Sequence, residues 1–354
     1  MTRRPRGSLA LTRGVAFAAA LALLLSACGG GGTGAPAATT TPGAAATSAA
    51  PAVGAKPADF PTKAITIITG SSPGGGMDVF SRQLGEGMKG TFPQPLVVEN
   101  KSGAGGANSL NETNKRPADA YALVTTTAGT CILTPFLQDA PLKCESFEPV
   151  ARIQGEDYYL FVRQESPHKT IEDFVKAATA KKPKIAGAWF GTLDSFVPFV
   201  FAQKANFQFD YVPFEGTGDA LTQLLGGSVE LLTANVSEVA GQLEAKKIRM
   251  LAIASAERTS DFKDVPTLKE KGWDVVVVQW RGILAPKGTP KDRREYLAAE
   301  FRKGMQSEVW KRFVQSSKSK DFFMGPDEFG KFMQEEATRY IALMKQYNMK
   351  EKAK

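Results

Sequence analysis

The sequence is poor in histidine and cysteine, and each shortage excludes a class of function. Its 354 residues include one histidine, His168, and three cysteines. So few imidazole and thiol groups supply no set of ligands at a recognised spacing, so the sequence predicts no metal site and no cofactor. His168 follows Ser166-Pro167 and is expected in an exposed loop, which leaves no histidine to act as a catalytic base.

The glycine-rich loops lack the companion residues of nucleotide-binding motifs. None carries the lysine of a phosphate-binding loop, and Asn108 and Leu221 stand where the dinucleotide fingerprint needs its third glycine. Nucleotide binding is therefore excluded as the leading interpretation. The four loops are 71–76, 102–106, 187–192 and 214–218.

A serine nucleophile is disfavoured by one proline. Gly70-Ser71-Ser72-Pro73-Gly74 matches the Gly-x-Ser-x-Gly pattern of a nucleophile elbow. The residue after the nucleophile must donate its N–H to an oxyanion, and Pro73 has none. The sequence predicts no catalytic residues. An enzyme that uses the acids near these loops stays open as an alternative, although such acids are also typical helix caps; they are Asp78, Asp194, Glu215 and Asp219.

The N-terminus predicts export. A basic stretch precedes an apolar run, Val15 to Leu25, which is too short to span a bilayer. Leu25-Ser26-Ala27-Cys28 resembles a bacterial lipobox, so residues 1–27 are predicted to be a lipoprotein signal peptide and Cys28 the lipidated residue. An ordinary signal peptide is the alternative. The expected location is extracytoplasmic, with a lipid anchor in the cell membrane.

Little charge and no apolar periodicity follow Cys28, so residues 28–59 are predicted to be a disordered tether rich in Gly, Ala, Thr and Pro. No second hydrophobic segment of spanning length follows. Removing residues 1–27 takes away four arginines and lowers the formal net charge from +8 to +4. Basic residues are scattered among acids, so we expect no nucleic-acid binding.

The two remaining cysteines leave two structures open. Cys131 and Cys144 are close in sequence, and outside the cytoplasm such a pair often forms a disulfide. They are otherwise two buried thiols in separate places, since sequence separation does not fix the distance between their Cα atoms.

Residues 60–354 form about 295 residues of alternating apolar runs and helical patterns, which predicts an α/β fold with two lobes and largely parallel sheets. Prolines after Thr289 and Gly325 predict helix starts, and the last helix has one apolar face. The expected strands begin near residues 65, 96, 121, 184, 210, 229, 250 and 274.

The glycine-rich loops fall where predicted strands end and helices begin. In parallel sheets such loops meet at a crevice that binds ligands. Glycine lets the backbone approach a ligand closely, and a helix start offers free N–H groups and the positive end of its dipole. Carboxylates suit that environment.

Seven ordered blocks carry a family resemblance that covers nearly everything after Phe60. The chain resembles the extracytoplasmic solute receptors of tripartite tricarboxylate transporters, also called the Bug family. The blocks are Phe60–Lys63, Pro73–Asp78, Val97–Gly106, Val212–Gly216, Ala220–Gly227, Val265–Gly272 and Trp280–Pro290.

The resemblance implies a periplasmic-binding-protein-like fold, with a ligand cleft between two Rossmann-like domains. Lobe 1 is expected at residues 60–152 and 281–354, and lobe 2 at 153–280. The protein is expected to be a monomer that closes over an organic acid and presents it to a large and a small membrane subunit. In the family two loops, here 71–78 and 214–219, grip a carboxylate, partly through waters. Backbone donors at two helix starts would suffice without a buried arginine.

Departures from the family pattern bear on the ligand. Ser195 stands where a histidine is usual, and Glu215 replaces a lysine or similar residue. These changes disfavour a tricarboxylate, while Trp189 and Phe190 are able either to stack on a ligand or to fill the core. We expect an aromatic mono- or dicarboxylate, with an aliphatic di- or tricarboxylate or a stand-alone sensor or carrier as alternatives. The predicted ligand-binding residues are Ser71, Ser72, Gly75, Gly76, Asp78, Ala104, Gly105, Thr127, Trp189, Phe190, Gly191, Thr192, Ser195, Gly216, Thr217, Gly218 and Asn235.

Overall fold

The computed structural model describes residues 54–214 and 216–352. The predicted signal peptide, the lipidated Cys28, most of the tether and Glu215 lie outside the described residues. Within the described part of the chain, no helix is long and apolar enough to cross a membrane.

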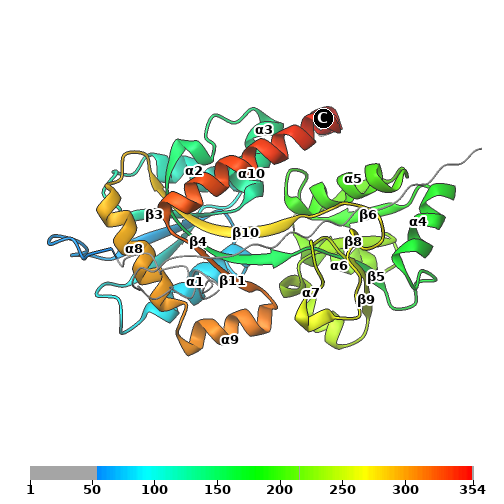
Figure 1. Cartoon of the computed structure of the whole chain (residues 1–354), viewed down its shortest axis with the longest axis horizontal. Helices are drawn as coiled ribbons and strands as arrows, with labels where there is room; N and C mark the ends of the chain where they lie inside the picture. Colours follow the sequence, from blue (N-terminus) through cyan, green and yellow to red (C-terminus); the bar gives the residue numbers. More distant parts are fainter. Residues whose placement is uncertain (1–53, 215, 353–354) are drawn as a thin grey trace, which may run out of the picture. The chain divides into compact units, whose positions relative to one another are not determined.

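The first sheet has six strands in the order β11-β4-β10-β3-β1-β2 (Figure 1). β1 pairs in parallel with β2 and β3, whereas β10 pairs antiparallel with β3 and β4, and β11 antiparallel with β4. Its strands are β1 (Ile65–Thr69), β2 (Leu96–Asn100), β3 (Ala122–Thr126), β4 (Phe147–Asp157), β10 (Val278–Pro286) and β11 (Lys320–Met324). The accompanying helices are α1 (Gly76–Met88), α2 (Ala107–Asn114), α3 (Thr134–Gln138), α8 (Lys291–Gly304), α9 (Glu308–Ser317), α10 (Pro326–Gln346) and α11 (Met349–Lys352).

The second sheet has five strands in the order β7-β6-β8-β5-β9. β6 pairs in parallel with β7 and β8, and β5 pairs antiparallel with β8 and β9. The strands are β5 (Tyr159–Arg163), β6 (Lys184–Gly187), β7 (Asp210–Pro213), β8 (Leu231–Ala234) and β9 (Ile248–Ile253). The helices are α4 (Ile171–Ala180), α5 (Leu193–Ala205), α6 (Thr217–Leu225) and α7 (Val236–Glu244).

The α/β fold with two sheets is confirmed, but the expectation of largely parallel sheets is wrong. Both sheets are mixed, because β4, β5, β10 and β11 run antiparallel to their neighbours. The strand expected at residues 274–278 is also wrong, since β10 begins at Val278 and continues to Pro286. The apolar residues 275–278 lie just before this strand and at its first position, so the sequence placed the strand too early.

Two long strands connect the halves of the fold. β4 and β10 pair from Phe147 and Pro286 to Asp157 and Val278, and β5 of the second sheet begins two residues after β4 ends (Figure 1). The predicted lobe boundaries at 152/153 and 280/281 fall inside these two strands and stay a prediction.

The folded part includes residues assigned to the tether by the sequence. Asp59 Oδ2 lies 2.9 Å from Arg293 Nη2, which ties the segment before Phe60 to helix α8. Near the middle of the chain Cys131 and Cys144 form a disulfide with a Cα–Cα distance of 4.8 Å. The disulfide joins the segment after β3 to the start of β4.

Candidate functional site

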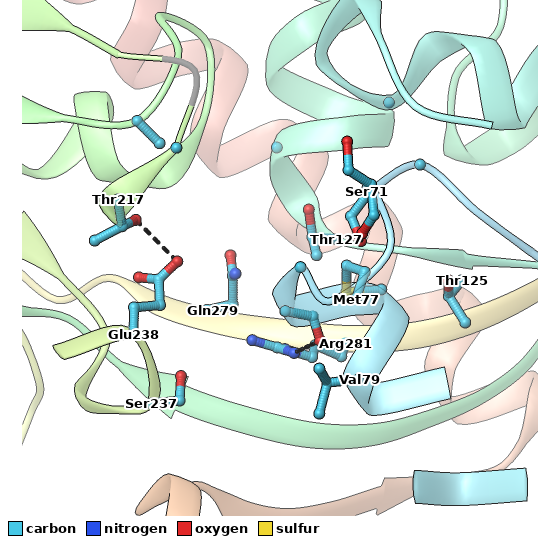
Figure 2. A pocket seen from close by; sticks show the side chains of 18 of the residues that line it. Ser71, Met77, Val79, Thr125, Thr127, Thr217, Ser237, Glu238, Gln279 and Arg281 are labelled. Carbon is cyan, nitrogen blue, oxygen red and sulfur yellow. Dashed lines mark hydrogen bonds between the residues drawn. The ribbon is translucent and has the colours of Figure 1, made fainter. Parts of the chain in front are cut away.

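A cleft of about 1430 Å³ lies between the two sheets. The starts of α1, α5 and α6 border it, together with β4, β10 and helix α9. Figure 2 shows Thr217 and Glu238 on one side, Ser71 and Thr127 on the other, and Arg281 between them. The cleft is larger than the roughly 300–1,000 Å³ of most small-molecule sites, so a small ligand would share it with water.

The start of α1 is held in shape by Asp78, which faces away from the cleft. Its carboxylate accepts hydrogen bonds from Gly74 N at 2.8 Å and from Asn100 Nδ2 at 2.9 Å, and it pairs with Arg82 at 2.8 Å. The Asp78 N–H in turn donates to Ser71 Oγ at 3.0 Å. Although burial alone would raise it, these bonds and the adjacent guanidinium lower the pKa of Asp78 below its usual value. Asp78 therefore stays ionised and rigidifies the loop.

Two N–H groups at this helix start are available to a ligand. Within the described residues, the N–H groups of Gly76 and Met77 have no hydrogen-bond partner, as expected for the first turn of a helix. Gly76 and Met77 both line the cleft. Unpaired N–H groups at the positive end of a helix dipole bind anions such as carboxylates.

The second loop of this wall requires glycine. Gly105 and Gly106 have φ angles of +61° and +91°, in the left-handed region that glycine favours. A Cβ on Gly106 would also lie 2.7 Å from Thr130 Cγ2. This close packing places the backbone of residues 102–106 at the cleft surface.

A buried arginine lies under the start of α1, and whether ligand binding needs it stays untested. Arg281 Nη1 donates to Gly76 O at 2.6 Å, and Arg281 Nη2 lies 3.0 Å from Glu156 Oε1. The two side chains are only 4% and 3% exposed. Ser237 Oγ donates to the other oxygen of Glu156 at 3.0 Å. Arg281 Nε has no partner within the described residues.

The opposite wall begins at α6. A Cβ added to Gly216 or Gly218 would meet no atom within 4 Å, so both glycines border open space. No partner among the described residues takes the N–H of Thr217 or Gly218, so this helix start is a second anion-binding position. Thr217 Oγ1 donates to Glu238 Oε1 at 2.9 Å, which links the starts of α6 and α7.

Two carboxyl groups of this wall have raised pKa values. Burial raises the pKa of Asp194 to about 6, and the nearby Glu156 adds to the effect. Loss of hydration between the walls of the cleft raises the pKa of Glu238, and the nearby Asp194 carboxylate raises it further. The Glu238 side chain is open to cleft water, which weakens that effect.

Twelve of the seventeen predicted ligand-binding residues line the cleft, and five do not. The lining residues are Ser71, Ser72, Gly75, Gly76, Ala104, Gly105, Thr127, Trp189, Thr192, Gly216, Thr217 and Gly218. The five that do not line it are Asp78, Phe190, Gly191, Ser195 and Asn235.

The side chains outside the cleft have structural partners. The Phe190 ring packs edge-on against Phe199 and Tyr211, with centroids 5.4 and 6.0 Å apart. Ser195 Oγ donates to Thr192 O at 2.8 Å and accepts from the N–H of Gly191 at 3.0 Å, so both residues shape the start of α5.

Asn235 has a structural role of the same kind. It caps α7, and its Nδ2 donates to Asp157 O at 2.9 Å. Phe190, Ser195 and Asn235 therefore build the wall of the cleft from behind.

Sequence reasoning missed the residues that come from long strands. Glu156 lies on β4, and Gln279 and Arg281 lie on β10; all three line the cleft. Glu238 was also missed, although its place in a capping box with Asn235 marks a helix start. A charged residue within an otherwise apolar strand is the one signal in the sequence that pointed to Arg281.

Comparisons with known proteins agree over most of the chain. Residues 80–349 match the family described as the tripartite tricarboxylate transporter family receptor. The protein BugT of Bordetella pertussis is 26% identical over 297 residues, which cover 82% of this chain and 91% of BugT.

Solved structures of similar proteins share the fold. A TctC solute-binding protein from Polaromonas is 27% identical with a TM-score of 0.68, covering 81% of this chain and 99% of that protein. MatC from Rhodopseudomonas palustris, solved with bound malate, is 24% identical with a TM-score of 0.70 and covers 80% and 99%. The likeness to MatC extends to the fold alone.

Proposed function

Because the chain belongs to the tripartite tricarboxylate transporter receptor family, we propose that it captures a small organic carboxylate outside the cytoplasm and delivers it to the membrane subunits of such a transporter. Receptors of this family bind small carboxylates and work with membrane transporter subunits. The anchor that we propose is a lipid on Cys28, and the receptor is proposed to act as a monomer without catalysis.

One observation carries this proposal. The unpaired N–H groups of Gly76 and Met77 face the cleft beside the buried guanidinium of Arg281. Arg281 is already offset by Glu156, so the position attracts one negative group without holding a full excess positive charge. Backbone donors of this kind bind a carboxylate at a fixed place and orientation.

The cleft favours one carboxylate more than two. Its second wall has free N–H groups at α6, but Asp194 and Glu238 stand beside them and would repel a second carboxylate. Trp189 is 43% exposed at the cleft and offers a ring for stacking, whereas Phe190 is engaged inside the protein. We therefore propose an aromatic monocarboxylate ahead of aromatic or aliphatic dicarboxylates.

Thermal unfolding with a panel of carboxylates tests the proposal. A ligand that binds only the folded protein stabilises it by about 2.7 kcal/mol when present at about a hundred times its dissociation constant. Panel members that bind will raise the melting temperature, and the corresponding amides, which lack the charge, will not. No shift with any organic acid would refute the carboxylate receptor.

A further inference from the structure

We propose that the second wall of the cleft holds a cationic group, so that the ligand is a small amino carboxylate with its ammonium group against Asp194 and Glu238. This inference rests on the proposed function for the carboxylate end of the ligand. It adds a separate subsite for the far end of the ligand.

The charges that line the cleft do not balance on this wall. Glu156 pairs with Arg281 at 3.0 Å, so Arg281 provides no unpaired positive charge for Asp194 or Glu238. Neither Asp194 nor Glu238 has an ion-pair partner within the residues described. Arg312 also lines the cleft, but it lies on the exposed surface of helix α9. A cation supplied by the ligand would neutralise this excess.

A buried, unpaired carboxylate oxygen lies next to the same subsite. Asp194 is 7% exposed and lines the cleft, yet its Oδ1 accepts no hydrogen bond from any described residue. Its Oδ2 accepts from the Tyr158 hydroxyl at 3.4 Å, and that hydroxyl also lies 3.1 Å from Gln279 Oε1. The Thr192 side chain and the backbone N–H of Asp194 also lower the pKa of this carboxyl group. A buried carboxylate oxygen without a partner is costly, so a cationic group nearby would stabilise the Asp194 carboxylate.

Helix capping accounts for only part of this arrangement. Glu238 accepts from Asn235 N at 3.1 Å and from Thr217 Oγ1 at 2.9 Å, one bond on each oxygen. A carboxylate has room for about four hydrogen bonds, so Glu238 keeps acceptor capacity that faces the cleft (Figure 2). Asp194 is at the start of α5, but its free Oδ1 serves no cap.

An organic cation suits the subsite better than a metal ion. Among the described residues, no group of three histidine, cysteine, aspartate or glutamate side chains is placed to hold a metal. Trp189 borders the same wall with 43% of its surface exposed, and an ammonium group is attracted to the face of an indole ring. Two carboxylates and one ring suit an ammonium group.

Matched probes separate the two ends of the ligand. Isothermal titration of the full chain with δ-aminovalerate, hexanoate and glutarate compares an ammonium, a methyl and a carboxylate at the same distance from the first carboxylate. We expect δ-aminovalerate to bind roughly tenfold to a hundredfold tighter than hexanoate, since charge-assisted hydrogen bonds are worth that factor. Para-(aminomethyl)benzoate and para-ethylbenzoate form the aromatic version of this comparison, and the same preference is expected.

Neutral variants test the two carboxylates against a matched control. Asp194→Asn and Glu238→Gln should each lower the ratio of δ-aminovalerate affinity to hexanoate affinity. Asp173→Asn is the control, because Asp173 holds the same capping-box position in α4 as Glu238 does in α7 and lies outside the cleft. The control should keep the preference. Thermal unfolding of each variant shows that it is folded.

Proton release on ligand binding gives an independent test of the cation subsite. The carboxylates of Asp194 and Glu238 are close enough to repel each other. Glu156, Arg281 and the Tyr158 hydroxyl also lie near them. A bound ammonium lowers both raised pKa values, so its binding releases protons and its affinity rises as the pH rises through the pKa of Asp194, about 6. Glutarate should show the opposite slope.

Each outcome decides one of the two proposals. If glutarate binds tightest, or if both neutral variants keep the preference for δ-aminovalerate, the cation subsite is refuted while the carboxylate receptor stands. Hexanoate binding as tightly as δ-aminovalerate refutes the subsite as well. If none of the carboxylates binds, the proposed function fails and the subsite fails with it.

Discussion

The buried ion pair between Arg281 and Glu156 predicts a large loss of stability when only one partner is removed. Arg281→Met leaves the carboxylate of Glu156 only 3% exposed and without its cation. It also removes the bond from Arg281 to Gly76 O, which fixes the start of α1 from below. Glu156 keeps the hydroxyl of Ser237 as its one donor.

The expected magnitude follows from the cost of an unpaired buried charge. Removing one partner of a buried pair costs roughly 3–5 kcal/mol. The double variant Arg281→Met with Glu156→Gln removes the charge as well, so it should recover most of that loss.

Urea unfolding at equilibrium measures both effects. The midpoint gives the change in the free energy of unfolding when the slope with denaturant is unchanged. The single variant should be clearly less stable than both the wild type and the double variant. A single variant as stable as the wild type, or a double variant less stable than the single one, would refute the assigned role of the pair.

Three further predictions concern the groups around the cleft and the disulfide. The raised pKa values of Asp194 and Glu238 favour the protonated carboxyls in the folded protein, so unliganded stability should fall as the pH rises through the pKa of Asp194, about 6. Asp194→Asn with Glu238→Gln should flatten that slope in urea unfolding. The disulfide closes a loop of sequence separation 13, so Cys131→Ser with Cys144→Ser should lower the free energy of unfolding, by about 3 kcal/mol on the loop-entropy scale; an intact mass that does not rise by two hydrogens on reduction would contradict the bond. Trp189 borders the cleft, whereas Trp273 packs against Phe201 outside it and Trp280 and Trp310 are fully buried. Ligand binding should therefore change tryptophan emission in the wild type and not in Trp189→Phe.

The helix starts were predictable because their chemistry is local. Pro73 to Gly76 and Phe214 to Gly218 combine a strand end, glycine and a helix start within a few residues. The α/β class followed from the alternation of strands and helices in the same way. Long-range pairing did not, because nothing in the apolar pattern of β4 or β10 states whether the neighbouring strand is parallel.

Side-chain direction and distant pairing explain the errors at the site. Arg281 and Glu156 are far apart in sequence and meet only because β10 and β4 pair across the sheet. Phe190 and Ser195 belong to the right loop, but their side chains point behind the wall that Trp189 and Thr192 face. Composition alone gives no indication of which way a loop residue points.

Filling the cleft at Gly218 tests the account most directly. Gly218 is an exposed glycine in the first turn of α6, and an added Cβ would meet no atom within 4 Å. Gly241 in α7 has the same open surroundings but does not line the cleft. Replacing glycine within a helix stabilises it by up to about 1 kcal/mol, so neither Gly218→Leu nor Gly241→Leu should lower stability.

Titration of these two variants with the tightest carboxylate of the panel is the decisive measurement. Gly218→Leu should lose binding, because leucine occupies the volume of the cleft that the ligand needs opposite the start of α1. Gly241→Leu should bind as the wild type does. Wild-type affinity in a folded Gly218→Leu protein would contradict the claim that the cleft between the two helix starts is where the carboxylate binds.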